Sequence, residues 1–331
     1  MSERKIRTAV VGVGSLGKHH LKWLAQLPQS QLVGCFDLDA EKTNSFACQY
    51  NVTPFRSLEE CAASVEAVSI VVTTKAHYEV ASCFLGKGIH CLIEKPVTAT
   101  LEEATKLQTL ANTKKVKAAV GHIERYNPAV RAALQAGIAP SFIEGHRLAS
   151  FNPRGADVAV ILDLMIHDID LALLFIKHPV VDIQASAVAV VSNSADIANA
   201  RLTFANGSVA NLTASRISLK EMRKLRLFQH AGYISLDLAK KEADSYRLIA
   251  SSEKGEGMRV PLGQSGHDVL YQKKQDDGVD MLGLELGEFL NSIIEAKLVA
   301  VSIADAAEAL RVALEVERIG RVSVEHLLQS Q

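Results

Sequence analysis

The sequence lacks the features that mark membrane proteins, nucleic-acid binders and secreted proteins. No run of about 18 apolar residues occurs, so no transmembrane helix is expected. The net charge is −1, from 36 Lys and Arg against 37 Asp and Glu, which argues against a general binder of nucleic acids or membrane surfaces. The apolar start of the chain is interrupted by glycines and closed by Lys18, and no small-residue cleavage site follows, so no signal peptide is predicted.

Cysteine is also scarce, and its spacing fits neither a disulfide framework nor a zinc site. The chain has five cysteines, an odd number, and no C-x-x-C pair occurs. All of them fall in the first third of the chain: Cys35, Cys48, Cys61, Cys83 and Cys91. We therefore expect reduced, mostly buried thiols in a cytoplasmic protein. The adjacent His19 and His20 have no recognised ligand spacing, and no metal site is predicted.

The strongest positive signal is a glycine fingerprint near the start of the chain. Thr8 to Val11 is a short apolar run of the kind buried in a parallel sheet, and glycines follow it in the pattern G-x-G-x-x-G. A helical pattern comes next, so the helix N-terminus can offer its N–H groups to a pyrophosphate. The pattern predicts a dinucleotide-binding turn formed by Gly12, Gly14, Ser15, Leu16 and Gly17.

The residue at the end of the next predicted strand favours NAD. That strand is Gln31 to Phe36, and Asp37 follows it, 25 residues after Gly12. A carboxylate at this place accepts hydrogen bonds from the ribose hydroxyls and repels a 2′-phosphate. No arginine follows before Arg56. We therefore expect NAD as the cofactor in preference to NADP. Asp39 is the predicted cap of the next helix.

Strands and helices alternate through residue 121, which predicts an α/β fold with a doubly wound parallel sheet. Ligands of such sheets bind at the carboxyl ends of the strands. Glu94 and Lys95 directly follow the strand expected at Ile89 to Ile93, so they lie at such an end. The expected organisation is a Rossmann NAD-binding domain over residues 1–122. A substrate-binding and oligomerisation domain of the α+β class is expected over residues 123–331.

Four motifs together resemble the Gfo/Idh/MocA family of oxidoreductases. They are the glycine fingerprint, H-x-x-x-A at 77–81, E-K-P at 94–96 and R-x-N-P at 125–128. The resemblance spans nearly the whole chain. It implies cofactor contacts from Thr73, Thr74, His77, Glu94 and Lys95. One departure is visible, because members usually carry Thr-Pro after the fourth strand and this chain has Thr74-Lys75.

Beyond residue 121 the sequence predicts short strands without long helices between them. They are expected at 141–150, 181–191, 198–204, 209–214, 224–230 and 233–238, with a hairpin turn at Asn206-Gly207. Residues 254–277 are expected to form a loop-rich excursion. Such strands build a mostly antiparallel sheet with one open face. Family members often use this sheet for dimer contacts, so the resemblance implies a homo-oligomer, a dimer or tetramer, formed through it.

A second dense motif, at residues 160–175, predicts the catalytic residues. Asp163 and His167 are four apart in an apolar helical pattern, so they are expected to share a helix face. A carboxylate that accepts from one imidazole nitrogen fixes the tautomer and leaves the other nitrogen as a base. D-x-x-x-H also matches the catalytic pair of the family. The alternative is that Asp163 caps a helix and His167 is a structural histidine with hydrogen-bonded ring nitrogens. The presence of Lys95 upstream weighs against this alternative. Asp168 and Asp170 are expected to face solvent.

Substrate contacts are expected from six residues: Lys95, Arg125, Asn127, Arg154, Asp163 and His167. Arg125 and Asn127 resemble cofactor- or substrate-contacting positions of the family, and a role in the domain linker is an equal alternative. Members usually carry a glycine pair just before D-x-x-x-H, where this chain has Ala159-Val160. Substrate contacts in that loop therefore cannot be copied from sugar dehydrogenases that have the glycines.

A basic cluster bears on the substrate class. Five positive charges fall within eleven residues, opposed by one glutamate: Arg216, Lys220, Arg223, Lys224 and Arg226. One interpretation is a solvated strand edge, and the other is a grip for the phosphates of a nucleotide-sugar. With G-H-I-E-R-Y-N-P at 121–128, the chain resembles family members that oxidise UDP-N-acetylglucosamine at its 3-hydroxyl.

The predicted function is hydride transfer between a secondary alcohol of a sugar or nucleotide-sugar and NAD. His167 is the predicted base, and Lys95 is predicted to orient the hydroxyl. One alternative is an NAD-dependent glycosidase on the same fold, which needs a further acid or base near the leaving group. Another is a regulatory protein that binds NAD without catalysis, and the presence of Lys95, Asp163 and His167 opposes it.

Overall fold

The computed structural model describes residues 4–152, 158–253, 255–263 and 265–329. Contacts between Cα atoms divide the chain into two compact units. Unit 1 contains Met1–Ile123 and Val279–Leu310, and unit 2 contains Glu124–Gly278 and Arg311–Gln331. The domain boundary was expected after residue 122. The chain first crosses from unit 1 to unit 2 between Ile123 and Glu124. Residues 279–310 add a second segment to unit 1.

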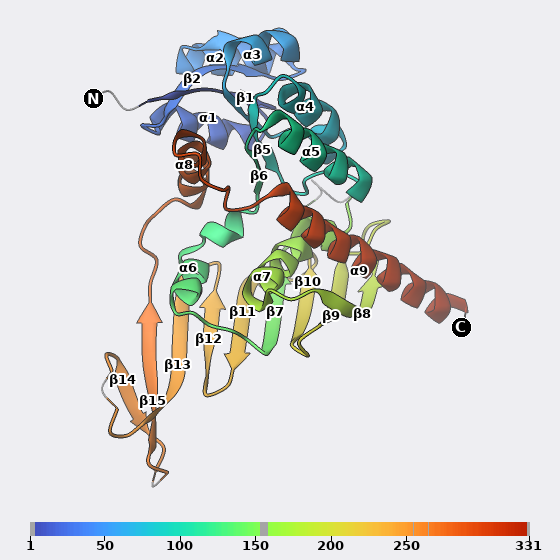
Figure 1. Ribbon diagram of the computed structural model, residues 1–331. Coiled ribbons are helices and arrows are strands. Elements are labelled where there is room, and N and C mark those ends of the chain that lie inside the picture. The colour runs from blue at the N-terminus through green and yellow to red at the C-terminus, as the bar shows by residue number, and fades with distance from the viewer. Residues whose placement is uncertain (1–3, 153–157, 254, 264, 330–331) are drawn as a thin grey trace. The chain divides into compact units, whose positions relative to one another are not determined.

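Unit 1 is built around a six-stranded parallel sheet with the order β3-β2-β1-β4-β5-β6 (Figure 1). The strand order reverses between β1 and β4, which is where dinucleotides bind in doubly wound sheets. The Rossmann prediction is therefore confirmed. The elements of its first segment are β1 (Ile6–Val11), α1 (Gly17–Gln26), β2 (Ser30–Phe36), α2 (Ala40–Tyr50), β3 (Thr53–Pro54), α3 (Leu58–Ser64), β4 (Ala67–Ile70), α4 (Thr74–Gly86), β5 (His90–Glu94), α5 (Leu101–Lys114) and β6 (Ala118–Gly121).

A helix from the far end of the chain completes unit 1. α8 (Met281–Ile294) packs against α1, and its Leu286 and Phe289 join the core of the parallel sheet. The two helices approach closely at Gly283, where a Cβ atom would lie 2.9 Å from the ring of Trp23. The packing of α8 carries Glu285 into the interior, where this residue is only 1% exposed.

Side-chain caps begin several helices of unit 1, and the cap of α2 is the predicted Asp39. The Asp39 carboxylate accepts hydrogen bonds from the backbone N–H groups of Glu41 and Lys42 at the start of α2. Thr100 and Glu103 form a capping box at the start of α5. These caps satisfy N–H groups that a helix leaves without an intrahelical partner.

Unit 2 is built around a nine-stranded sheet with the order β14-β15-β13-β12-β11-β7-β10-β9-β8. Only β7 and β10 pair in parallel among its described strands, and the predicted mostly antiparallel sheet is confirmed. α7 packs against β7 and β10, and α6 packs against β12 and β13 (Figure 1). The elements before β8 are η1 (Ile123–Tyr126), which starts at the end of unit 1, α6 (Pro128–Gln135), β7 (Phe142–Leu148), η2 (Ile161–Met165) and α7 (Ile166–Ile176).

The remaining strands of unit 2 follow one another with no described helix between them. They are β8 (Val180–Val188), β9 (Ile197–Phe204), β10 (Val209–Ser215), β11 (Met222–Gln229), β12 (Gly232–Asp237), β13 (Glu242–Ala250), β14 (Met258–Pro261) and β15 (His267–Lys274). The prediction of a loop-rich excursion over residues 254–277 is wrong, because β14 and β15 lie there. β13 was not predicted at all. Strand formation depends on cross-strand partners. β13 pairs with β12 and β15, and β14 pairs with β15. α9 (Ile303–Gln329) ends the chain, and the division between the units falls within it.

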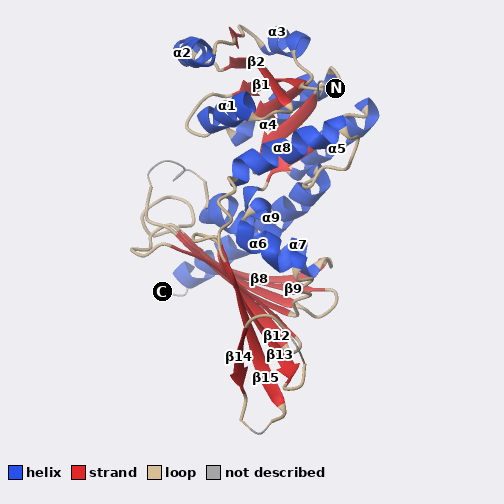
Figure 2. Ribbon diagram, turned by 90° about the vertical axis from the view of Figure 1, so that its left-hand side faces the viewer, coloured by secondary structure: helices blue, strands red, loops and turns tan. Residues whose placement is uncertain are grey.

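The other face of this sheet carries a row of aromatic rings across five neighbouring strands. Adjacent ring centroids lie between 4.4 and 5.6 Å apart. Figure 2 shows the twist of the strands that carry the row. The rings belong to Phe142, Phe228, Tyr233, Tyr246 and Tyr271.

Candidate active site

The glycine turn has the shape that a dinucleotide phosphate needs. Gly12 has a φ of +91°, and a Cβ atom there would lie 2.5 Å from the backbone oxygen of Val71. A Cβ atom at Gly17 would lie 1.9 Å from the backbone oxygen of Gly12. At Gly14, by contrast, no described atom lies within 4 Å of the Cβ position. The protein backbone therefore requires Gly12 and Gly17, and the open space at Gly14 fits a pyrophosphate.

The start of α1 adds a favourable electrostatic environment beside this space. Ser15 and Leu16 are exposed, and no side chain of a described residue caps the helix at Leu16. The N–H groups and the positive dipole end of the helix are therefore suited to bind phosphate oxygens.

Asp37 lies beside the glycine turn, at the carboxyl end of β2. Its Oδ2 accepts a hydrogen bond from the backbone N–H of Val13 at 2.8 Å, and its Oδ1 accepts one from the N–H of Asp39 at 3.0 Å. These two bonds fix the carboxylate next to the phosphate-binding space. In this type of sheet, an acidic residue at the end of the second strand binds the ribose hydroxyls of a dinucleotide, and Asp37 lies at that place.

The loop after β4 and the first turn of α4 contain three more residues for which cofactor contacts are predicted. Thr73 precedes α4 and Thr74 begins it. His77 is buried, with Nδ1 2.8 Å from the carbonyl oxygen of Pro96 and Nε2 3.1 Å from that of Val72. His77 thereby ties this loop to the E-K-P turn after β5. Direct contacts of Thr73, Thr74 and His77 with the cofactor stay predictions.

Glu94 and Lys95 lie at the carboxyl end of β5, as expected. Lys95 is half-buried. Oε2 of Glu94 accepts a hydrogen bond from the backbone N–H of Lys95 at 3.3 Å, and its Oε1 lies 3.2 Å from Nε2 of His20. The strand end that carries Lys95 is therefore connected by side chains to the phosphate-binding helix α1.

The D-x-x-x-H segment is helical, but it is not one continuous α-helix. Asp163 lies in η2, a π-helical turn, and His167 lies in the first turn of α7. The single α-helix expected over both residues is corrected to two helical elements, because a π-helix bonds i to i+5 and turns less per residue. The shared face of Asp163 and His167 stays a prediction. π-helical turns are rare and occur frequently at functional sites. Both side chains are half-buried.

The two acids that follow His167 do not face solvent, contrary to the prediction. Asp168 is 3% exposed and makes a double hydrogen bond with Arg147, whose second partner is Glu124. Burial opposes the charge of Arg147, but the carboxylates of Asp168 and Glu124 outweigh burial and raise the pKa of its guanidinium. Asp170 is 1% exposed and pairs with Arg125 at 2.6 Å. The start of α7 is thereby anchored by two ion pairs.

The same ion pairs account for two of the predicted substrate residues. The Arg125 guanidinium donates to both oxygens of Asp170. Asn127 is 1% exposed, caps α6 through the N–H of Ala129, and donates to Glu124. These contacts give both residues a structural role, and a substrate role for either stays a prediction. Arg154 lies outside the described residues.

The basic cluster does not form one phosphate grip, and that interpretation is wrong. Arg216 is buried against Asp196, with Nε 2.8 Å from Oδ1. Arg226 points to the open face of the sheet and pairs with Glu144 at 3.2 Å. Arg223 takes the opposite face, because successive residues of a strand alternate.

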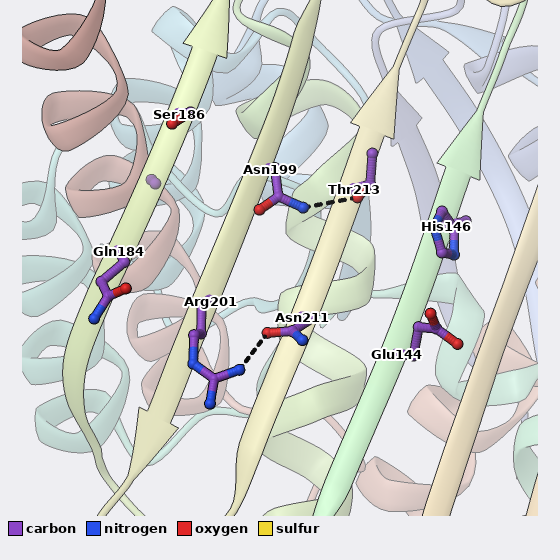
Figure 3. Close-up of a pocket in the computed structure, with 9 residues that line it drawn as sticks. Glu144, His146, Gln184, Ser186, Asn199, Arg201, Asn211 and Thr213 are labelled. Carbon is purple, nitrogen blue, oxygen red and sulfur yellow. Dashed lines mark hydrogen bonds between the residues drawn. The ribbon is translucent and has the colours of Figure 1, made fainter.

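A polar hollow lies on the open face of the unit 2 sheet (Figure 3). Arg201 donates to Asn211 at 3.0 Å, and Asn199 donates to Thr213 at 2.9 Å. Neither Asp163 nor His167 belongs to its lining, so the hollow is not the predicted catalytic site. Its lining residues are Glu144, His146, Gln184, Ala185, Ser186, Asn199, Arg201, Asn211 and Thr213.

Comparison with known proteins identifies the family. Residues 6–122 match a model described as an oxidoreductase family with an NAD-binding Rossmann fold, and residues 140–235 match the Gfo/Idh/MocA C-terminal domain. The chain is also 40% identical over 325 residues to UDP-N-acetylglucosamine 3-dehydrogenase of Acidithiobacillus ferrooxidans. This match covers 98% of this chain and 99% of the relative. The chain belongs to the Gfo/Idh/MocA family of oxidoreductases.

Other members of the Gfo/Idh/MocA family agree with this assignment. A solved structure of the Acidithiobacillus ferrooxidans enzyme has a TM-score of 0.86 at 37% identity and covers 95% of this chain and 97% of its own. Inositol 2-dehydrogenase of Rhizobium meliloti is 26% identical over 231 residues, 64% of this chain and 69% of the relative. The chain is thus an NAD-binding oxidoreductase with the fold of this family.

One residue of this Gfo/Idh/MocA chain that lies beside the predicted site was missed by the sequence analysis. His20 of α1 reaches Glu94 at the end of β5, and these two residues are 74 positions apart in the chain, so no local sequence signal indicates their contact. In the described part of the chain no helix has the length and apolar character to cross a membrane. No group of three or more metal-ligating side chains is found among these residues.

Proposed function

We propose that this oxidoreductase removes hydride from C3 of UDP-N-acetylglucosamine, with NAD as the acceptor. The observation that carries the proposal is the 40% identity, over 98% of the chain, to an enzyme with that activity. The relatives described above are dehydrogenases, which favours dehydrogenation over the glycosidase and regulatory alternatives.

Two side chains are proposed to act on the same substrate hydroxyl. His167 takes the O–H proton as the C–H bond breaks, so the alcohol carbon becomes a ketone carbon. The ammonium group of Lys95 donates a hydrogen bond to the same oxygen, orients it and stabilises the negative charge that develops there. Asp163 orients the imidazole of His167. When bound, NAD accepts the two electrons and the hydrogen nucleus as hydride at C4 of its nicotinamide.

The residues that would hold NAD follow from the geometry of unit 1. The pyrophosphate would bind between Gly14 and the start of α1, and Asp37 would accept hydrogen bonds from the ribose hydroxyls. Thr73, Thr74, His77, Glu94 and Lys95 would line the nicotinamide side. We assign NAD binding to unit 1 and substrate binding to unit 2, with Arg125, Asn127 and Arg154 as further substrate contacts.

Two assignments about context complete the proposal. We propose that the protein forms a homo-oligomer, a dimer or tetramer, through the open face of the unit 2 sheet, because an uncovered row of aromatic rings is suited to a protein contact. Sedimentation of Tyr246→Glu against wild type tests this, and an unchanged oligomer would contradict it.

A cytoplasmic location fits the five free thiols.

The substrate assignment is tested by NADH formation with a panel of alcohols. UDP-N-acetylglucosamine, UDP-glucose, N-acetylglucosamine, glucose 6-phosphate and myo-inositol are compared at equal concentration. The expected result is the highest kcat/KM with UDP-N-acetylglucosamine, and reduction of the product with borodeuteride should place deuterium at C3 of the sugar. A higher kcat/KM with an inositol or a simple hexose would overturn the substrate.

A further inference from the structure

A buried imidazole lies between the phosphate-binding helix and the strand end that carries Lys95. His20 is 2% exposed, and its Nδ1 lies 2.7 Å from the hydroxyl oxygen of Ser69 on β4. Its Nε2 lies 3.2 Å from Oε1 of Glu94. Both ring nitrogens are therefore engaged, which fixes the orientation of the ring. An imidazole held in this way holds its carboxylate partner in turn.

Glu94, held by His20, in turn holds the backbone of Lys95. Its second oxygen, Oε2, accepts a hydrogen bond from the backbone N–H of Lys95. Burial raises the pKa of Glu94, but the hydrogen bond from His20 and the charge of Lys95 outweigh burial and lower it below the usual value. Glu94 is therefore ionised at neutral pH.

The neighbouring strand leaves space for this carboxylate. Gly121 of β6 pairs in register with Glu94, and a Cβ atom there would lie 3.0 Å from Oε1 and 3.2 Å from Oε2 of Glu94. Even an alanine would press on the carboxylate. The absence of a side chain at Gly121 is thus matched to the position of Glu94.

We propose that His20 is a positioning residue for Lys95 and that it acts through the carboxylate of Glu94. The inference rests on the proposed function, in which Lys95 orients the substrate hydroxyl. His20 holds one oxygen of Glu94, and the other oxygen accepts from the backbone N–H of Lys95.

The role of His20 is tested by replacing its imidazole while Glu94 and Lys95 at the end of β5 stay unchanged. His20→Leu should lower kcat by about 10- to 100-fold, because small displacements of a positioned group cost this much, with the Kd for NAD unchanged. His20→Gln keeps a donor for Glu94 and should recover most of kcat. His90→Leu is the matched control, because His90 accepts from the backbone N–H of Lys117 and lies at the other end of β5. It should lower the melting temperature and leave kcat unchanged. A weaker Kd for NAD with kcat preserved in His20→Leu would overturn the positioning role.

A readout without substrate separates this inference from the proposed function. Lysine side chains are methylated with 13C, and the signal of Lys95 is assigned by its loss in Lys95→Arg. This signal should shift in His20→Leu and stay in place in His90→Leu. A wild type that oxidises no sugar would refute the proposed function alone. An unshifted Lys95 signal would refute the positioning group whatever the activity.

Discussion

The Asp37 carboxylate accepts a hydrogen bond from the backbone N–H of Val13, with 2.8 Å between Oδ2 and N. This contact fixes the acid at the end of β2 beside the glycine turn that we propose binds the pyrophosphate. The arrangement predicts how the enzyme distinguishes NAD from NADP, because an additional phosphate on the ribose would meet a fixed negative charge.

Asp37→Ala should lower kcat/KM for NAD by about 10- to 100-fold, which corresponds to the loss of hydrogen bonds to a charged group. The ratio of kcat/KM for NADP to that for NAD should rise. Asp39→Ala is the matched control two residues away, since Asp39 caps α2. This control should lower the melting temperature and leave the cofactor ratio unchanged. An unchanged ratio in Asp37→Ala would exclude Asp37 from ribose binding.

Two glycines of the same turn should respond differently to alanine. Gly17→Ala places a Cβ 1.9 Å from the backbone oxygen of Gly12, so this variant should unfold at a much lower temperature. Gly14→Ala has open space and should melt like the wild type, but its methyl group should block the pyrophosphate and weaken NAD binding. Thermal melting and NAD titration of both variants check this. Normal NAD affinity in Gly14→Ala would place the cofactor elsewhere.

The buried ion pair beneath His167 should be essential for stability. Arg147→Met leaves Asp168 and Glu124 buried without their partner, and we expect a loss of about 3–5 kcal/mol in the free energy of unfolding. Arg226→Met is the control, because its pair with Glu144 is half-exposed and should contribute less than about 1 kcal/mol. Urea unfolding measures both. Equal losses in the two variants would contradict the buried anchor of α7.

The thiols should differ sharply in reactivity. Burial raises the pKa of Cys35 to about 11 and that of Cys61 to about 12, so almost no thiolate forms at pH 8. Cys48 is exposed. In a titration with a disulfide reagent at pH 8, Cys48 should react fast, whereas Cys35 and Cys61 should react only after the protein is denatured. Rapid reaction of Cys61 in the native protein would show that its part of unit 1 opens.

Much of unit 1 is predictable because its signals are local. The alternation of strands and helices, the glycine turn and the capping residues Asp39 and Thr100 each depend on a few neighbouring residues. The packing of α8 against α1, by contrast, depends on residues that are far apart in the sequence. It depends on the fit of Gly283 against Trp23, two positions that lie far apart along the chain.

The site region of unit 2 was harder to predict for the same physical reason. Two acids in an exposed-looking pattern, Asp168 and Asp170, are buried because Arg147 and Arg125 reach them from other segments. The π-helical turn at Asp163 changes the hydrogen-bond register of a helix, and hydrophobic periodicity does not report that register. One end of the sheet, formed by β13, β15 and β14, depends on pairing between segments with weak individual propensity.

The most direct test of the proposed chemistry is a double-mutant cycle between Lys95 and His167. Single-turnover formation of NADH from UDP-N-acetylglucosamine is measured for wild type, Lys95→Ala, His167→Ala and the double variant at saturating NAD. Each single change should slow the reaction by about 10²- to 10⁴-fold, and oxidation by the wild type should slow as the pH is lowered and His167 takes up a proton. Residues that act together on one hydroxyl are strongly non-additive, so the double variant should be little slower than the slower single variant. Fully additive losses, or a His167→Ala variant with the wild-type rate, would contradict joint action of the two residues on one substrate oxygen.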